Sequence, residues 1–199
     1  MESAIKHKPK KTTKRFTQDF SDSYYRGLKG IYFYRILKKI IEIGNLKNRD
    51  VKVLDFGCGI GKLKELLPDK VICFDIQPEF TEIDDWRKAK FDVIVANQVF
   101  YLVTEKELRN FLAELYRINR GVELIVAVSK RRLIHRILKY FFRPDAWADT
   151  KLMPVEELRV LTEKMNVLKK VNVLSMADVY LMKFKDANIF KEYKNNRGI

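Results

Sequence analysis

The sequence contains too few cysteines and histidines for several classes of site. It has two of each in 199 residues. Cys58 and Cys73 alone cannot build a disulfide framework, and no group of cysteines and histidines has the spacing of zinc ligands. We therefore expect no metal site, and the low cysteine content is typical of a protein from a reducing compartment.

Long apolar runs are also missing. The most apolar stretch, residues 31–43, is interrupted by Arg35, Lys38 and Lys39, whereas a membrane span needs roughly 20 consecutive apolar residues. The chain begins with basic and polar residues and lacks the apolar segment of a secretion signal. We expect a cytoplasmic protein without a transmembrane segment, and its oligomeric state stays open.

Acidic residues are outnumbered by basic ones. The chain has 40 Lys and Arg against 26 Asp and Glu, a formal charge of +14. Residues 1–15 contain six basic residues and one acid, and residues 129–143 contain six basic residues and no acid. Such clusters attract anions, among them nucleic-acid phosphates, acidic metabolites and anionic membrane surfaces.

Strand-like and helix-like patterns alternate along the rest of the chain. Strands are predicted at residues 51–56, 71–75, 91–96, 122–128, 167–174 and 179–184, and helices at residues 22–43, 62–67, 104–121 and 154–165. This alternation predicts an α/β fold with a doubly wound, mainly parallel sheet, and the last two strands form an antiparallel C-terminal hairpin. We expect residues 1–20 to be a basic flexible tail and residues 21–199 a single domain.

The sharpest motif is D-F-G-C-G-I-G at residues 55–61. Gly57, Gly59 and Gly61 directly follow a predicted strand and precede a helix, as a tight turn with positive φ requires. The positive N-terminal end of that helix faces whatever occupies the turn. Asp75, at the end of the next strand, is placed to accept hydrogen bonds from the hydroxyls of a ribose.

Two classes of nucleotide cofactor use this geometry. A dinucleotide fingerprint has its third glycine at the position of Lys62, which disfavours a nicotinamide-type Rossmann domain. The dinucleotide fingerprint also gives no role to a carboxylate two residues before the first glycine, where this chain has Asp55. Asp55 has such a role if the ligand carries an ammonium group. A glycine turn that binds no ligand is the structural alternative.

At these residues the chain resembles the class I S-adenosylmethionine-dependent methyltransferases, in particular the small-molecule type. The resemblance covers roughly residues 51–184, and its specific part is D-x-G-x-G-x-G with the downstream acid. It implies a Rossmann-like methyltransferase fold, methyltransferase activity and S-adenosyl-L-methionine as cofactor. The implied cofactor-binding residues are Asp55, Gly57, Cys58, Gly59 and Gly61 on the methionine side, Asp75 at the ribose, Ile76, Asp84, Asp85 and Trp86 near the adenine, and Asn97 and Gln98 beside the sulfonium.

One segment departs from the family. Only fifteen residues, 76–90, separate the second and third predicted strands, too few for a full helix and a further strand. We therefore expect the region after the second strand to be reduced to a turn.

The methyl acceptor is less well defined by the sequence. Residues 97–101 lack the Asn/Asp-Pro-Pro-Tyr loop that positions planar amines, neither cysteine is placed to attack a pyrimidine, and the region of a magnesium-dependent catechol site is basic. No catalytic residue is assigned, because methyl transfer chiefly requires alignment of the acceptor. We expect an anionic small-molecule or lipid-linked acceptor, with substrate contacts from Tyr25, Tyr101, Arg131, Arg132 and His135.

Other interpretations of the basic segments remain open. Residues 131–142 have helical apolar spacing, which suits a lid, an interfacial helix on an anionic membrane, or an ordinary helix that covers the sheet. The N-terminal arm suits an RNA or tRNA methyltransferase, although it lacks interleaved aromatics for base stacking. A non-catalytic scaffold that keeps the cofactor pocket is a further alternative.

Overall fold

The computed structural model describes residues 25–130 and 150–185. Within them the elements follow in the order α2 (Gly27–Ile43), β1 (Val53–Phe56), α3 (Lys62–Leu66), β2 (Val71–Phe74), η1 (Trp86–Lys88), β3 (Val93–Asn97), η2 (Phe100–Leu102), α4 (Glu105–Ile118), β4 (Glu123–Ser129), α6 (Pro154–Lys164), β5 (Met165–Val173) and β6 (Ala177–Phe184). The predicted basic tail, the helix start near residue 22 and the amphipathic segment 131–142 lie outside these residues.

The strands form one sheet in the order β2-β1-β3-β4-β6-β5. Strands β1 to β4 run parallel to one another, whereas β6 runs antiparallel to both β4 and β5. This confirms the predicted doubly wound, mainly parallel sheet with an antiparallel C-terminal hairpin. In the register, Asp55 lies between Cys73 and Val95, so the carboxyl ends of β1, β2 and β3 meet at one edge.

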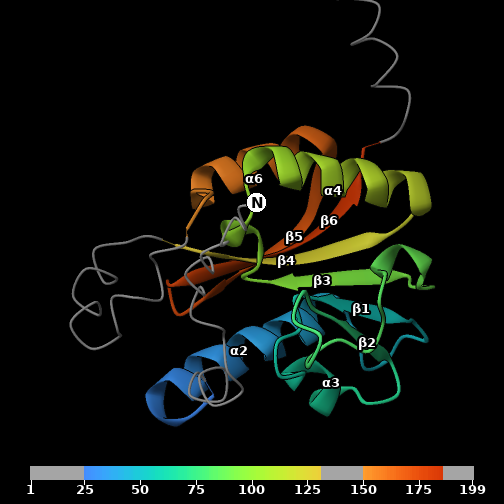
Figure 1. Ribbon diagram of the computed structural model, residues 1–199. Coiled ribbons are helices and arrows are strands. Elements are labelled where there is room, and N and C mark those ends of the chain that lie inside the picture. The colour runs from blue at the N-terminus through green and yellow to red at the C-terminus, as the bar shows by residue number, and fades with distance from the viewer. Residues whose placement is uncertain (1–24, 131–149, 186–199) are drawn as a thin grey trace, which may run out of the picture.

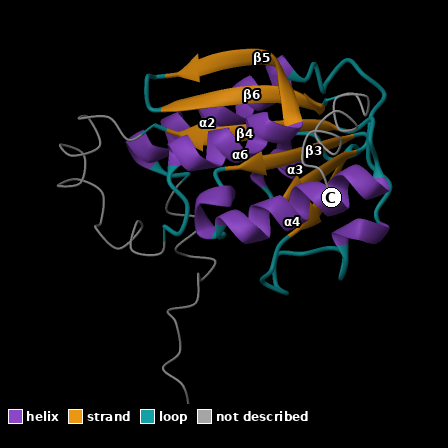
Figure 2. Cartoon of the chain, turned by 90° about the horizontal axis from the view of Figure 1, so that it is seen from above, coloured by secondary structure: helices purple, strands orange, loops and turns teal. Residues whose placement is uncertain are grey.

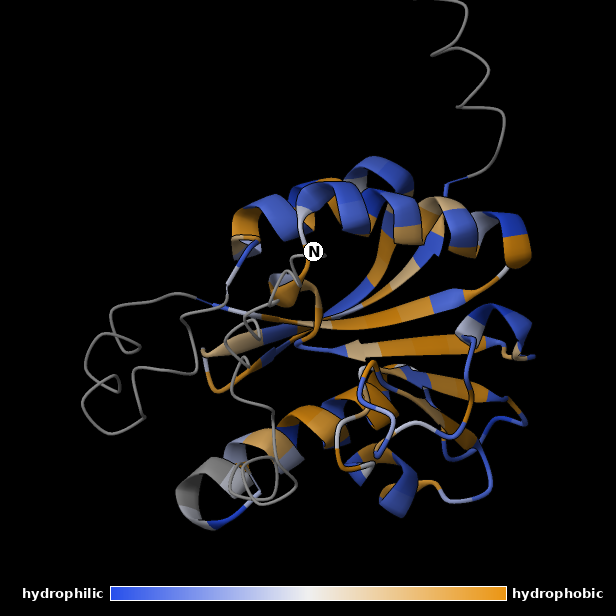
Figure 3. Ribbon diagram, viewed as in Figure 1, coloured by the Kyte–Doolittle hydropathy of each residue, from blue (hydrophilic) through white to orange (hydrophobic). Residues whose placement is uncertain are grey.

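Helices cover both faces of the sheet (Figures 1 and 2). Alternate strand residues point to opposite sides: Val53 and Val95 join the core with α2 and α3, whereas Leu54 and Ile94 join the core with α4 and α6. Figure 3 shows largely apolar strands next to α4 and α6, whose ribbons are mostly hydrophilic, whereas α2 is largely apolar. The two apolar layers hold the carboxyl edge of the parallel strands in place.

The region after β2 is reduced, as its length predicts. Between β2 and β3 the structure has the short helix η1 and no strand. Glu82 takes the place of a neighbouring strand: its N–H donates to the Cys73 carbonyl at 3.0 Å, and its carboxylate accepts from the Cys73 N–H at 2.9 Å. Glu82 thereby provides hydrogen-bond partners for two backbone groups at the exposed edge of β2.

One helix end differs in detail from the prediction. The capping box of Thr104 and Glu107 starts α4 as expected, but the helix ends at Ile118 rather than at Gly121. Asn119 adopts an extended conformation there, and its side chain donates to the Phe91 carbonyl at 3.0 Å. After α2, Asn45 is left-handed with φ 50°, whereas Gly44 is right-handed.

Candidate active site

The glycine motif forms the turn that its spacing predicts. Gly57, Gly59 and Gly61 have φ values of 76°, 52° and 73°. The backbone N–H groups of Gly57 and Cys58 both donate to the Phe74 carbonyl, at 2.8 and 3.2 Å, which ties the turn to the end of β2. A Cβ at Gly59 would have nothing within 4 Å. The middle of the turn is therefore open to a ligand.

Asp75 is directed at this turn. Its Oδ2 atom accepts from the Gly59 N–H at 3.0 Å, and its Oδ1 atom accepts from the Gln77 N–H at 3.0 Å. Each carboxylate oxygen has two lone-pair directions, so both can accept a further hydrogen bond. The structure therefore joins Asp75 to the glycine turn and leaves acceptor capacity for a ribose.

Asp55 lies beneath the turn and is 4% exposed. Among the described residues, no hydrogen bond or ion pair satisfies its carboxyl group. Burial, and then the charge of Asp75, raise its pKa from 3.8 to about 7. A buried acid in this state favours a positively charged neighbour, because a cation offsets the cost of removing the carboxylate from water. An ammonium or sulfonium group would meet that requirement.

Tyr25 also reaches the turn. Burial, and then the nearby Asp55, raise the pKa of its hydroxyl. The Lys62 ammonium lies 6.0 Å from the centre of its ring. The Tyr25 ring packs against Phe33 and Tyr34, with ring centres 5.7 and 5.4 Å away. Tyr25, which precedes α2, thus lies close to Asp55 and Lys62 at the glycine turn.

The residues expected around the adenine are less well gathered. Ile76 is 89% exposed, and Asp84 is exposed. The Asp85 carboxylate accepts from Arg87 Nε at 2.7 Å and caps η1. Trp86 is buried and packs against Phe56 and Phe111 in the core. The Trp86 ring thus lies against the residue that directly precedes the glycine turn, and its contact with an adenine stays a prediction.

Cys58 lies in the turn, and its thiol donates to the Phe80 carbonyl at 3.3 Å. This contact holds the segment after β2 against the glycine motif. A hydrogen bond with Cys73, and then burial, raise the pKa of the Cys58 thiol. The thiol is therefore a packing group here rather than a nucleophile.

At the end of β3, Asn97 and Gln98 face the space beside the turn. The Asn97 Oδ1 atom is buried without a hydrogen-bond partner among the described residues. Gln98 has φ 56°, and its Nε2 atom donates to the Tyr32 hydroxyl at 3.1 Å. A non-glycine residue with positive φ is strained, and such residues gather at functional sites.

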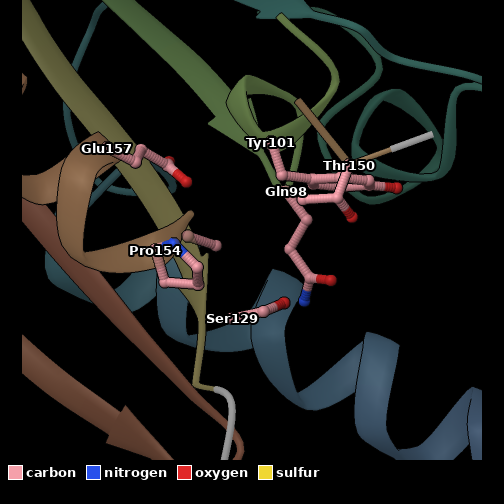
Figure 4. Close-up of a pocket in the computed structure, with 7 residues that line it drawn as sticks. Gln98, Tyr101, Ser129, Thr150, Pro154 and Glu157 are labelled. Atoms are coloured by element: carbon pink, nitrogen blue, oxygen red, sulfur yellow. The ribbon is translucent and has the colours of Figure 1, made fainter. Parts of the chain in front are cut away.

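A pocket opens next to Gln98 (Figure 4). Its cavity volume is about 10 Å³, room for one water-sized group. It is lined by Gln98, Tyr101, Ala127, Ser129, Thr150, Pro154 and Glu157. The Tyr101 carbonyl accepts from the backbone N–H of Lys151 at 2.9 Å, which closes the loop after β3 against the segment before α6. Tyr101 thus lines the pocket, and its contact with a substrate stays a prediction. Arg131, Arg132 and His135 lie outside the described residues.

The sequence analysis missed several of these residues. Tyr32, Ser129, Thr150 and Glu157 come from four separate segments, and no local motif connects them. One signal was available: Glu157 falls on the apolar side of α6, four positions before Leu161, where a charged residue is unexpected.

Within residues 25–130 and 150–185, no group of three or more His, Cys, Asp or Glu side chains is arranged to hold a metal ion. No helix in this part of the chain is both long and apolar enough to cross a bilayer.

Comparison of sequences gives no relatives, since no family model and no curated protein matches the chain. Solved structures do match. The chain is similar to the PH0226 protein from Pyrococcus horikoshii OT3, with a TM-score of 0.59 and 16% identity over 81% of this chain and 93% of that one.

Two methyltransferases solved with S-adenosyl-L-homocysteine are also similar. The N-methyltransferase NodS from Bradyrhizobium japonicum WM9 has a TM-score of 0.56 and 14% identity over 78% of this chain and 88% of that one. Magnesium protoporphyrin IX methyltransferase from Synechocystis PCC 6803 has a TM-score of 0.51 and 12% identity over 83% and 93%. The chain therefore has the Rossmann-like methyltransferase fold, and the fold that the glycine motif implies is confirmed.

Proposed function

We propose that this protein is a methyltransferase that binds S-adenosyl-L-methionine in the glycine turn. The observation that carries the proposal is Asp55, a buried carboxyl group without a partner among the described residues, beneath three left-handed glycines. Asp75, hydrogen-bonded to Gly59 at 3.0 Å, supplies the second carboxylate. The fold supports the same function, because two similar structures carry the demethylated product of this cofactor.

The described residues suit the parts of the cofactor. Asp55 is placed for its cationic methionine end, the open backbone at Gly59 for its carboxylate, and Asp75 for its ribose. Asn97 Oδ1, buried and unpartnered, is a candidate acceptor near the sulfonium. When bound, this cofactor supplies a methyl group that is activated by a positively charged sulfur.

We further propose a small-molecule acceptor, which enters next to Gln98, and a cytoplasmic location. An acidic or lipid-linked acceptor that meets Arg131, Arg132 and His135 stays a proposal based on the sequence. The alternatives are an RNA acceptor held by the basic arm and a scaffold that binds the cofactor without turnover.

Calorimetric titration with S-adenosyl-L-homocysteine tests the cofactor site. We expect the wild-type protein to bind and Asp75→Ala to bind about 10- to 100-fold more weakly, since hydrogen bonds to a charged group contribute about 1.5–3 kcal/mol. Asp69→Ala, which changes an exposed aspartate on the turn before β2, is the matched control. A wild-type protein that does not bind, or an Asp75→Ala variant with unchanged affinity, would refute the proposal.

The alternatives give different results. An RNA acceptor predicts RNA binding that weakens steeply with salt and disappears when residues 1–15 are removed. A scaffold predicts full affinity for S-adenosyl-L-homocysteine but no methyl transfer to any member of an acceptor panel.

A further inference from the structure

The side chain of Glu157 is the most unusual group outside the glycine turn. It lies in the first turn of α6, lines the pocket and is 3% exposed. Its Oε1 atom is buried without a hydrogen-bond partner among the described residues. A buried polar atom without a partner costs about 1–3 kcal/mol. A ligand that supplies the missing partner gives a physical reason for an acid at this position.

Helix α6 does not need this carboxyl group for its own stability. The neighbouring Glu156 forms the cap, because its Oε2 atom accepts from the Met153 N–H at 3.0 Å. Glu156 is exposed, whereas Glu157 points inward. Burial raises the pKa of Glu157 to about 8, so the fold makes its charged form costly rather than stabilising it.

The other described pocket residues supply no positive charge for Glu157. Apart from Glu157, the one titratable side chain in the lining is Tyr101. Lys130, next to the lining residue Ser129, is engaged elsewhere, since its ammonium lies 2.6 Å from the Asp178 carboxylate. A second buried atom, Thr150 Oγ1, also lacks a described partner. The lining therefore complements a cationic group that donates hydrogen bonds.

The pocket is adjacent to the proposed methyl donor. Its lining residue Gln98 precedes Val99, whose side chain lies against Gly57: a Cβ at Gly57 would come within 2.5 Å of Val99 Cγ2. Residues 98 and 99 thus connect the lining of the pocket with the glycine turn. In Figure 4 the Glu157 carboxyl group points into the space across from Gln98 and Thr150.

We propose that this pocket receives the ammonium group of an aliphatic amine that serves as the methyl acceptor, and that the Glu157 carboxylate binds this group and takes one proton from it. The proposal rests on the proposed methyltransferase function. A protonated amine has no lone pair with which to attack. Proton transfer to Glu157 gives a carboxylic acid and a neutral amine. The amine lone pair then forms the new N–C bond, and the electrons of the C–S bond return to sulfur, which leaves a thioether and a methylated ammonium ion.

The raised pKa of Glu157 suits the role of a general base. A general base works best when its pKa lies near the working pH, and the value of about 8 meets that condition. The absent Asn/Asp-Pro-Pro-Tyr loop does not conflict, since that loop serves planar amines rather than basic aliphatic ones.

Three isosteric probes test the charge that the pocket prefers. Propylamine, 1-propanol and propionate are titrated into protein saturated with S-adenosyl-L-homocysteine, and binding is followed by NMR at the Gln98 side-chain amide. We expect propylamine to bind most tightly and to lose at least tenfold in affinity in Glu157→Gln. In wild-type protein with ¹³C-labelled glutamate, saturation with propylamine is expected to lower the pKa of Glu157 by one unit or more.

Glu156→Gln is the matched control, because glutamine retains the cap and the residue faces solvent. It is expected to bind propylamine as the wild type does. Equal propylamine affinity in wild type and Glu157→Gln, an unchanged Glu157 pKa, or tighter binding of propanol or propionate would overturn the amine proposal. Failure of S-adenosyl-L-homocysteine itself to bind would instead refute the proposed function. The wild-type titration does not depend on how well any variant folds.

Discussion

Replacement of Asp55 by asparagine tests whether the cofactor site carries a stability cost. The fold raises the pKa of Asp55 from 3.8 to about 7. Between these values the folded protein holds a proton that the unfolded chain has lost, so stability falls as the pH rises through this window. At about 1.4 kcal/mol per pKa unit, the loss is roughly 1.6 kcal/mol at pH 5 and roughly 4 kcal/mol at pH 9. Asparagine stays neutral and avoids this loss.

We therefore expect Asp55→Asn to gain about 2–3 kcal/mol more in free energy of unfolding at pH 9 than at pH 5, relative to the wild type. Urea denaturation at the two pH values measures this difference, and any pH-independent cost of the new amide cancels. The same variant is expected to lose most of its thermal stabilisation by S-adenosyl-L-methionine. A stability difference that does not depend on pH, or that has the opposite sign, would contradict the reasoning.

Two further substitutions test the turn and a helix cap. Gly57→Ala is expected to lower the free energy of unfolding by about 2–4 kcal/mol, because it combines a positive φ with a 2.5 Å approach to Val99. Gly59→Ala has open space around its Cβ and is expected to lower the free energy of unfolding by only about 1 kcal/mol. It is still expected to weaken the binding of S-adenosyl-L-homocysteine. Thr104→Ala is expected to lower the free energy of unfolding by about 1 kcal/mol through loss of the α4 cap, whereas Thr162→Ala, inside α6, is expected to lower it less. Denaturant titration measures both variants, and equal losses would refute the capping argument.

The glycine turn could be predicted from the sequence because its geometry is local. Three glycines at a spacing of two, between a strand and a helix, require left-handed backbone whatever surrounds them. The same holds for the reduced region after β2, where chain length alone excludes a helix and a strand. Asp75 follows from these elements, since parallel strands bring their carboxyl ends to one edge.

The pocket could not be predicted in this way. Glu157 and Gln98 are 59 positions apart in the printed sequence, and the packing of α6 on the sheet brings them together. Tyr32, which hydrogen-bonds Gln98, comes from the opposite helical layer. Periodicity reports which face of a helix is apolar, but it does not report which distant side chain meets that face. The burial of Trp86 among aromatic side chains of the core was likewise not visible from its place beside two acids, and its contact with an adenine stays a prediction.

The distribution of buried acids separates structural from functional carboxylates in this chain. Asp178 is 3% exposed, and although burial opposes its charge, contacts from Asn172, Lys130 and Lys170 hold its pKa below the ordinary value. Glu123 is likewise paired, with Arg49 at 2.7 Å and Lys183 at 3.3 Å. Where a carboxylate serves the fold, the described structure thus provides its cations.

Asp55 and Glu157 receive no such partners from the described residues, and both have raised pKa values. Asp55 lies at the carboxyl edge of the parallel strands, and Glu157 lines the pocket next to Gln98, at the end of β3. Because unpaired buried acids destabilise a fold, these two are best explained by positively charged ligands. One carboxyl group would face the methyl donor and the other its acceptor, and the two variants Asp55→Asn and Glu157→Gln separate these roles by which ligand each variant fails to bind.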